Sequence, residues 1–219
     1  MATGFCHPFS MIVCGPSQCG KTHFVSKLLK AAPAYFFPPP CHVIWAYGKM
    51  DRKQQSFLEE TSSVPITFHK GVPSADMFDE MDDDSEPQLL VLDDLMHEVG
   101  DNKLVVKLFT QGCHHGNLSV ILLLQNMYHQ APNMVTVRRN GHYRVLFANP
   151  GDMSGVHTLE RQCFPGSGHF LLDAYKQACS VPYGYLILDF HPRTLNEDLR
   201  VCTGIFPPSV VRIFKKKKQ

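Results

Sequence analysis

One short segment combines residue types whose spacing is typical of phosphate binding. It runs Gly15-Pro16-Ser17-Gln18-Cys19-Gly20-Lys21-Thr22 and matches G-x-x-x-x-G-K-[ST] at every fixed position. The two glycines permit backbone angles that let successive N–H groups point at phosphate oxygens. We expect Lys21 to reach the β- and γ-phosphates of a nucleotide such as ATP, and the Thr22 hydroxyl to bind Mg²⁺. An apolar stretch precedes the segment and a helical pattern follows it, so a chance match in a glycine-containing turn is the weaker interpretation.

A pair of carboxylates follows a second apolar stretch. Asp93 and Asp94 come directly after Leu89–Leu92. We expect Asp93 to hold the Mg²⁺ shell, usually through water, and Asp94 to orient or deprotonate an attacking water. Many ATPases of this type carry glutamate at the second position, and aspartate is one methylene shorter. Glu98, one helical turn on, is a weaker candidate for the same role. The alternative interpretation of the pair is a helix N-cap followed by an acid in the first turn.

The next apolar run, Leu118–Leu124, ends in the amides Gln125 and Asn126. In a sheet whose carboxyl ends carry the site, Gln125 would lie near the γ-phosphate, where an amide can sense the phosphate or hold the attacking water. A strand-end amide that satisfies loop backbone is the alternative. If this strand lies between the phosphate-loop strand and the Asp93 strand, the order marks the additional-strand ATPases. No N-K-x-D motif indicates guanine recognition.

These motifs require strands and helices that position them. Short apolar runs predict strands at Phe9–Val13, His42–Tyr47, Ile66–His69, Leu89–Leu92, Leu118–Leu124, Tyr143–Phe147 and Tyr185–Asp189. Helical patterns lie between them at Lys21–Ala32, Arg52–Glu60, Lys103–Gln111, Ser154–Cys163 and Phe170–Cys179. This alternation predicts an α/β fold of the P-loop NTPase (RecA/ASCE-like) type, a three-layer α/β/α sandwich with a mainly parallel sheet. We expect a single P-loop ATPase domain over residues 1–214 and a basic tail over residues 215–219.

Length and composition exclude several classes of protein. The 219 residues are 44% hydrophobic and 19% charged, which is typical of one globular domain. No apolar run approaches the roughly 20 residues of a membrane span, and the N-terminus lacks the pattern of a secretory signal. The eight cysteines include no C-x-x-C, so we expect reduced thiols in an intracellular protein. Cys113-His114-His115 lacks a nearby fourth metal ligand, and Asp76–Glu86 is best interpreted as a solvated acidic face.

Further segments add to these motifs and together resemble one family. They are Val43–Gly48, Leu92–Met96, His114–Val120 and Val145–Pro150. Over roughly Phe9 to Phe206, the chain resembles the viral genome-packaging ATPases of the FtsK/HerA superfamily, in particular those of Polinton/Maverick-type elements and adintoviruses, which are related to the poxvirus packaging ATPase. The resemblance implies an oligomeric, ring-shaped motor that uses ATP and Mg²⁺ to pump double-stranded DNA into a preformed capsid. It also implies capsid or portal-like vertex proteins as partners, and no membrane.

Rings of this kind complete each site with an arginine from the neighbouring subunit. Relatives often carry basic residues just before the glutamine-bearing strand and after Asn-Pro, whereas this chain has no arginine in residues 112–116 and has Gly151 after Asn-Pro. Arg139 is our first candidate for this arginine finger. The further candidates are Arg138, Arg144 and Arg161, and a plain surface or salt-bridge role is the alternative for each of the four.

The charge of the chain bears on its partners. The formal net charge is only +1, so any nucleic-acid contact must be local or shared among subunits. Lys215–Lys218 suits a nuclear-import signal or a contact with DNA phosphates, and a solubilising end is the alternative. The resemblance favours nuclear import. It implies that the protein acts in the host nucleus or the virion. Two other functions stay open: a P-loop nucleotide or polynucleotide kinase, which would want an arginine-rich lid, and a degenerate nucleotide-binding assembly scaffold.

Overall fold

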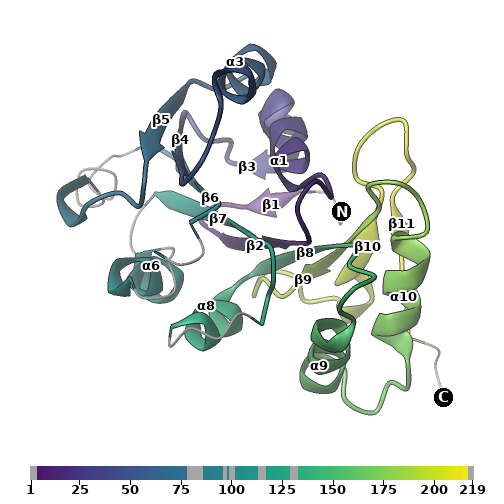
Figure 1. The fold of residues 1–219 in the computed structure, drawn as a ribbon. Helices are drawn as coiled ribbons and strands as arrows, with labels where there is room; N and C mark the ends of the chain where they lie inside the picture. Colours follow the sequence, from purple (N-terminus) through teal and green to yellow (C-terminus); the bar gives the residue numbers. More distant parts are fainter. Residues whose placement is uncertain are drawn as a thin grey trace.

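The computed structural model describes residues 4–77, 86–95, 98, 102–112, 117–128 and 133–216. Within these ranges, nine strands form one sheet in the order β11-β10-β9-β8-β2-β7-β6-β4-β5 (Figure 1). The strands are β2 (Ser10–Cys14), β4 (His42–Tyr47), β5 (Ile66–Lys70), β6 (Gln88–Asp93), β7 (Leu118–Leu124), β8 (Tyr143–Phe147), β9 (Tyr185–Asp189), β10 (Val201–Thr203) and β11 (Arg212–Ile213). A separate pair, β1 (Phe5–Cys6) and β3 (Phe36–Phe37), forms a small parallel sheet.

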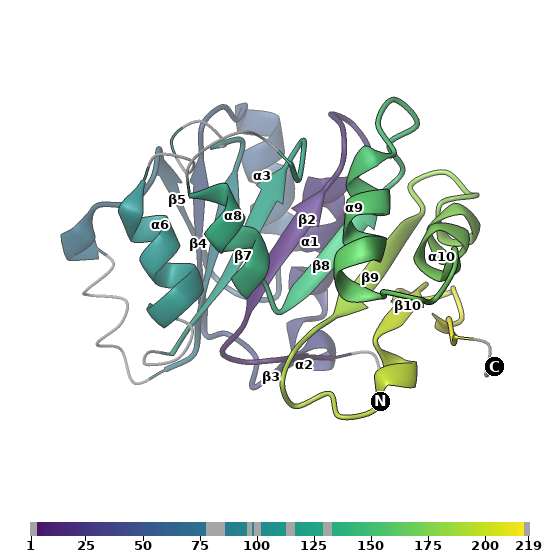
Figure 2. The same cartoon turned by 90° about the horizontal axis from the view of Figure 1, so that it is seen from below.

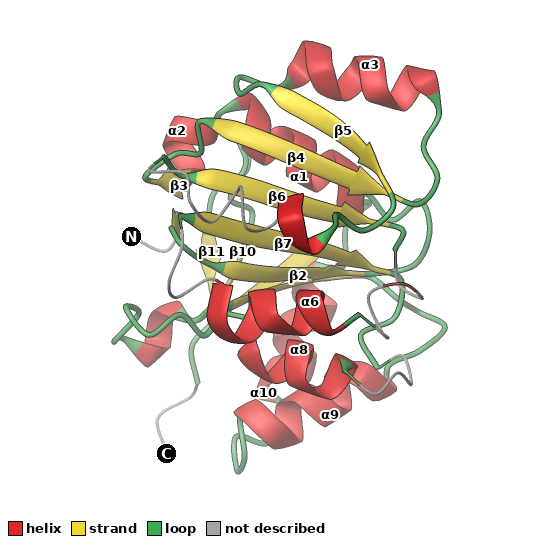
Figure 3. Ribbon diagram, turned by 90° about the vertical axis from the view of Figure 1, so that its left-hand side faces the viewer, coloured by secondary structure: helices red, strands yellow, loops and turns green. Residues whose placement is uncertain are grey.

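Strands β5, β4, β6, β7, β2 and β8 run parallel, so their carboxyl ends meet at one edge of the sheet (Figure 3). Strands β9, β10 and β11 continue the sheet in antiparallel fashion beyond β8. Strand β7 lies between β2 and β6, which is the order expected of the additional-strand ATPases. The predicted α/β fold with a mainly parallel sheet is therefore confirmed.

Helices cover both faces of the sheet (Figure 2). One face carries α1 (Lys21–Lys30), α2 (Ala32–Tyr35) and α3 (Arg52–Thr61). The opposite face carries α6 (Lys103–Lys107), the π-helical turn η1 (Leu108–Gly112), α8 (Met134–Asn140), α9 (Ser154–Cys163) and α10 (Phe170–Ala178). A short 3₁₀ turn, η2 (Glu197–Leu199), precedes β10.

The continuous apolar runs are explained by burial on both sides. In β6, Leu89 and Val91 pack into the core beneath α1, whereas Leu90 and Leu92 pack into the core beneath α6 and α8. Successive side chains of a strand point to opposite faces, so a strand covered on both faces needs apolar residues throughout. Helix α1 repeats apolar residues at helical spacing and buries Phe24, Val25, Leu28 and Leu29 against the sheet.

The structure also contains elements that the sequence patterns did not predict. Strand β1 lies near the N-terminus, α2 and β3 lie in the segment that contains Pro33 and Pro38-Pro39-Pro40, and β10 and β11 extend the antiparallel edge. These strands are only two or three residues long, too short to show a period. The predicted helix Lys103–Gln111 is α6 followed by η1. Most of the acidic segment Asp76–Glu86, and all of Cys113-His114-His115, lie outside the described residues.

The start of the predicted basic tail contacts the fold. The Phe214 backbone N–H donates to the Val201 carbonyl oxygen at 2.9 Å, directly after β11. Lys215 Nζ lies 3.8 Å from Asp198 Oδ2, and Lys216 Nζ lies 5.3 Å from the centre of the Phe164 ring. Residues 217–219 lie outside the described residues.

Candidate nucleotide-binding site

The phosphate loop connects the carboxyl end of β2 to the first turn of α1, as its motif predicts. Gly20 has a φ of 105°, a left-handed conformation that favours glycine. A Cβ on Gly15 would lie 2.7 Å from both Phe147 Cβ and Cys19 Sγ, so only glycine fits there without displacing a neighbour. The geometry of the loop therefore explains why the motif has glycine at both fixed positions. The loop brings backbone N–H groups and the positive end of the α1 dipole to one place.

Lys21 is half-buried and folds over this loop. Its Nζ donates to the carbonyl oxygens of Gly15 at 2.6 Å and Pro16 at 2.8 Å. These contacts hold the ammonium group directly above the loop backbone. The positive charge and the loop N–H groups therefore lie close together, which suits a polyanion such as a triphosphate.

Thr22 and Asp93 meet across the sheet edge although 71 positions separate them. The Thr22 hydroxyl donates to Asp93 Oδ2 at 3.5 Å. Burial is the main cause that raises the pKa of Asp93 to about 6; the nearby Asp94 carboxylate contributes to this rise, and Lys21 and the Thr22 hydroxyl oppose it. The carboxyl group is therefore mainly ionised at neutral pH, despite its burial. A hydroxyl and a carboxylate oxygen this close form a hard-oxygen donor set that suits Mg²⁺.

Trp45 contributes to the environment of Asp93 from the neighbouring strand β4. Its indole is fully buried, and a hydrogen bond from its N–H would lower the pKa of Asp93. However, Trp45 Nε1 has no hydrogen-bond partner of good geometry within the described part of the chain. We therefore attribute the state of Asp93 mainly to burial. Sequence patterning gave Trp45 no role, because an aromatic residue in an apolar strand looks like ordinary core.

Asp94 and Gln125 form the second contact between motifs. Both residues are exposed, and Gln125 Nε2 donates to Asp94 Oδ1 at 3.3 Å. Asp94 has a φ of 54°, an uncommon left-handed conformation that aspartate tolerates better than most residues. The amide at the end of β7 therefore orients the carboxylate at the end of β6.

Gly48 contacts the backbone of both acids, although no sequence pattern assigned it a chemical role. Its backbone N–H donates to the Asp93 carbonyl oxygen at 3.0 Å. A Cβ at this position would lie only 2.4 Å from the Asp94 carbonyl oxygen, which is backbone and cannot move away cheaply. Glu98, the weaker candidate, instead accepts a hydrogen bond from the Val72 backbone N–H at 3.3 Å. Glu98 is therefore directed toward the segment that follows β5.

Arg139 is exposed in the last turn of α8, at the sheet edge opposite the phosphate loop. The next residue, Asn140, accepts a hydrogen bond from the hydroxyl of Ser10, the first residue of β2. At about 3.3 Å per residue, the length of β2 places the carboxyl edge more than 10 Å away. Arg139 therefore does not approach the phosphate loop of its own subunit.

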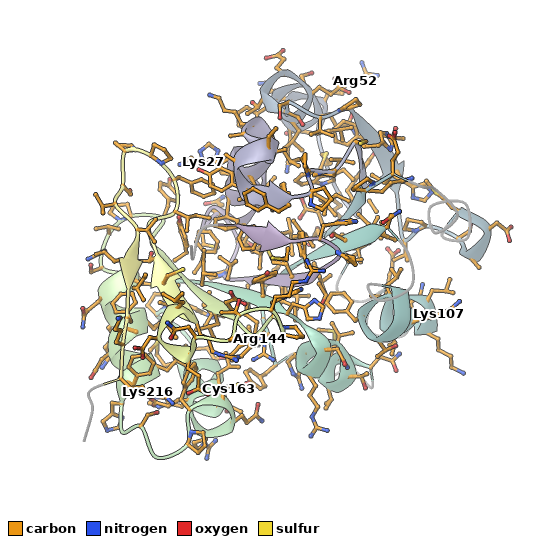
Figure 4. The ribbon with its side chains drawn as sticks, turned by 180° about the vertical axis from the view of Figure 1, so that it is seen from behind. Lys27, Arg52, Lys107, Arg144, Cys163 and Lys216 are labelled. Atoms are coloured by element: carbon orange, nitrogen blue, oxygen red, sulfur yellow. The ribbon has the colours of Figure 1, made fainter. Side chains whose placement is uncertain are left out.

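The other candidate arginines differ in exposure. Arg144 is only 7% exposed, and its Nη2 donates to the Arg138 carbonyl oxygen at 2.7 Å. Figure 4 shows Arg144 within the fold, whereas Arg52 and Lys107 lie at its periphery. Arg138 Nη1 donates to the Met127 carbonyl oxygen at 2.9 Å, and Arg161 is exposed on α9. The contacts of Arg144 and Arg138 are those of side chains that hold this face of the protein together.

Elsewhere in the described ranges, the structure offers no competing site of comparable chemistry. A groove of about 700 Å³ follows α9 and residues 164–169, but it contains none of the motif residues. Within the described ranges, no group of three His, Cys, Asp or Glu residues could hold a metal ion, and the cysteines found there form no disulfide. In the same ranges, no helix has both the length and the apolar character needed to cross a bilayer.

Comparisons with known proteins give likeness in fold only. No family model and no curated protein matches the chain. The crystal structure of B204, the DNA-packaging ATPase from Sulfolobus turreted icosahedral virus, aligns with a TM-score of 0.57 at 13% identity, over 97% of this chain and 100% of that chain. The genome-packaging NTPase B204 from Sulfolobus turreted icosahedral virus 2, in complex with ATPγS, gives 0.50 at 13%, over 95% and 97%.

A third solved structure comes from a different kind of protein. ATPases 2 and 3 of EssC from Geobacillus thermodenitrificans align with a TM-score of 0.51 at 11% identity, over 96% of this chain but 40% of that chain. At such identities the likeness concerns architecture alone. The chain has the α/β fold with a mainly parallel central sheet that is found in the P-loop packaging ATPases.

Proposed function

We propose that this chain is an ATP-hydrolysing motor that moves double-stranded DNA into a preformed capsid. One observation carries the ATPase part of the proposal: the Thr22–Asp93 and Asp94–Gln125 contacts lie side by side at the carboxyl edge, next to a complete phosphate loop. The fold likeness to a DNA-packaging ATPase, and to a packaging NTPase in complex with ATPγS, supports the packaging part and the choice of ATP.

In this proposal the phosphate loop binds the triphosphate. Loop N–H groups and the start of α1 stabilise its negative charge. Lys21 moves from the carbonyl oxygens of Gly15 and Pro16 to the β- and γ-phosphates. Thr22 and Asp93 would hold Mg²⁺, which supplies charge neutralisation at the β- and γ-phosphate oxygens.

Asp94 acts on the attacking water. The water oxygen bonds to the γ-phosphorus, the bond to the β,γ-bridging oxygen breaks, and the water proton passes to Asp94. Gln125 holds the Asp94 carboxylate through its amide, so the base is oriented before the water arrives. Aspartate reaches less far than glutamate, and the left-handed backbone of Asp94 changes the direction in which this short side chain projects.

Assembly belongs to the same proposal. Arg139 is exposed and distant from its own phosphate loop, so it could serve only the site of a neighbouring subunit. A homo-oligomeric ring around duplex DNA needs few basic groups per subunit, which agrees with the net charge of +1. Capsid or portal-like vertex proteins would be the further partners, and the host nucleus or the virion the place of action.

The first test is Lys21→Ala. Loss of the ammonium removes charge stabilisation of the transferring phosphoryl group, so ATP turnover should fall by about 10²–10³-fold. Lys27→Ala, on the same helix but exposed, is the matched control and should keep wild-type turnover. Phosphate release is measured with and without duplex DNA, and DNA should stimulate the wild-type rate.

Each alternative function gives a different result. Phosphate transfer to a nucleoside or a polynucleotide end, with no DNA stimulation, would identify a kinase. Binding of ATP without turnover, with or without DNA, would identify a nucleotide-binding scaffold, in which Asp94 is too short to act as base. Equal turnover in Lys21→Ala and wild type would contradict the assignment of the phosphate loop.

A further inference from the structure

Tyr183 is a highly exposed aromatic residue beside the phosphate loop. Its side chain is 72% exposed, more than that of Phe37 or Phe57. A Cβ built on Gly20 would lie 3.2 Å from Tyr183 Cδ1 and 3.7 Å from its Cβ. The ring therefore stands against the last glycine of the loop, directly before Lys21. Exposure of a large apolar ring to water is unfavourable, so its position next to a ligand-binding loop calls for a functional reason.

The loop that carries Tyr183 is compact. It joins α10 to β9 and is closed by a hydrogen bond from the Gly184 N–H to the Val181 carbonyl oxygen at 2.9 Å. A Cβ on Gly184 would lie 2.4 Å from the Ala178 carbonyl oxygen, so the turn packs against the end of α10. Tyr183 itself has a φ of 58°, a left-handed conformation that is uncommon for an aromatic residue. The ring is thus presented to solvent by a tight turn.

Strand order determines which end of a nucleotide faces this ring. Asp93 ends β6 and Gln125 follows β7, and both strands lie on one side of β2, so the γ-phosphate and its cation belong on that side. Strands β8 and β9 lie on the other side of β2, and Tyr183 lies two residues before β9. A triphosphate bound along the loop therefore directs its nucleoside toward Tyr183.

We propose that Tyr183 is the stacking platform for the base of the nucleotide, an inference that rests on the proposed nucleotide-binding function. The flat face of a phenol ring suits a flat aromatic base. Stacking removes the contacting face of the ring and that of the base from water. The Tyr183 side chain is 72% exposed, so its ring is available to a ligand. Every base has such a face, so Tyr183 provides affinity for the nucleoside without choosing between adenine and guanine.

The experiment distinguishes binding of the base from binding of the phosphates. Binding of ATPγS, GTPγS and inorganic tripolyphosphate, each with Mg²⁺, is measured by calorimetry for the full chain and its variants. Tyr183→Ala should weaken ATPγS and GTPγS roughly tenfold each and leave tripolyphosphate unchanged. Tyr183→Phe keeps the ring and should bind all three ligands as wild type does. Leu195→Ala removes an 87% exposed side chain beyond the far end of β9 and is the matched control.

The outcomes also separate this inference from the proposed function. Unchanged ATPγS affinity in Tyr183→Ala, or an equal loss for tripolyphosphate, would overturn the stacking role and leave the phosphate loop in place. Equal affinity of the wild type for tripolyphosphate and ATPγS would do the same, because no part of the nucleoside would then be recognised. A wild-type protein that binds none of the three ligands would instead overturn the proposed function.

Discussion

Asp93 shows how a residue of the proposed site can lower the stability of the fold. Its carboxyl group is largely buried, with one hydroxyl and one ammonium group near it, and its pKa is about 6. The ordinary value near 3.8 applies to the unfolded chain. The folded state therefore binds this proton more tightly than the unfolded state does, and ionisation of Asp93 at neutral pH destabilises the fold.

The first prediction concerns Asp93→Asn in nucleotide-free protein. The cost of ionisation is absent below pH 3.8 and complete above about pH 6, so the variant should gain stability only as pH rises through this interval. At pH 7.5 we expect a gain on the order of 1–3 kcal/mol in the free energy of unfolding. Denaturant titrations at pH 7.5 and at pH 4 measure it, with the exposed Asp76→Asn as control. A gain of equal size at both pH values would contradict this origin.

At the scale of elements, the site depends on how closely β4 approaches β6. The Gly48 N–H donates to the carbonyl oxygen of Asp93, and no space for a Cβ exists between Gly48 and Asp94. The end of β6 is thus held by backbone contacts, while the end of β7 supplies the amide of Gln125. Three strand ends together determine where the Asp94 carboxylate lies.

The second prediction follows from this packing. Gly48→Ala places a methyl group 2.4 Å from the Asp94 carbonyl oxygen, so the turn after β6 must shift. We expect ATP turnover to fall by about tenfold or more, with ATPγS affinity nearly unchanged, because the phosphate loop is not involved. An unfolding cost of about 1–3 kcal/mol should accompany it.

The control for this variant is Gly151→Ala. The added Cβ there meets only Asn149 Oδ1, at 3.6 Å, which is an ordinary contact. Its turnover and stability should match those of the wild type. If Gly48→Ala behaved like Gly151→Ala, close approach of the two strands would not be what positions Asp94.

At the scale of the whole molecule, the two sheet edges carry different halves of the proposed site. The phosphate loop, Asp93 and Asp94 lie at the carboxyl edge, and Arg139 lies at the amino edge. A head-to-tail association brings unlike surfaces together and closes into a ring when its rotation allows. Such an arrangement would place the Arg139 of one subunit near the phosphate loop of the next.

The third prediction tests this arrangement by mixing variants. Arg139→Ala alone should lose about 10³-fold in turnover, and Lys21→Ala alone about 10²–10³-fold. Random mixing makes about a quarter of the interfaces join an intact phosphate loop to an intact Arg139, so activity should return in the mixture. Arg52→Ala, on the opposite face of the sheet, is the control and should be active alone. A mixture as inactive as its components would exclude Arg139 as a finger in trans.

Much of the fold follows from local patterns. The strands β4, β7, β8 and β9 begin and end where apolar runs predict them, because a strand buried on both faces must be apolar throughout. The phosphate loop is equally local, since eight consecutive residues contain all of its chemistry. The short strands β10 and β11 escaped prediction because their stability comes from pairing with β9 and with each other.

By itself, the sequence determined the phosphate loop, the acids and amide that follow two buried strands, and the α/β class of the fold, because each depends on neighbours in the chain. Only the tertiary structure decided strand order, which joins Thr22 to Asp93 across 71 positions and Asp94 to Gln125 across 31. It also decided that Arg144 is interior and that Tyr183 stands beside Gly20. Such contacts depend on the packing of distant segments, for which no local pattern carries a signal.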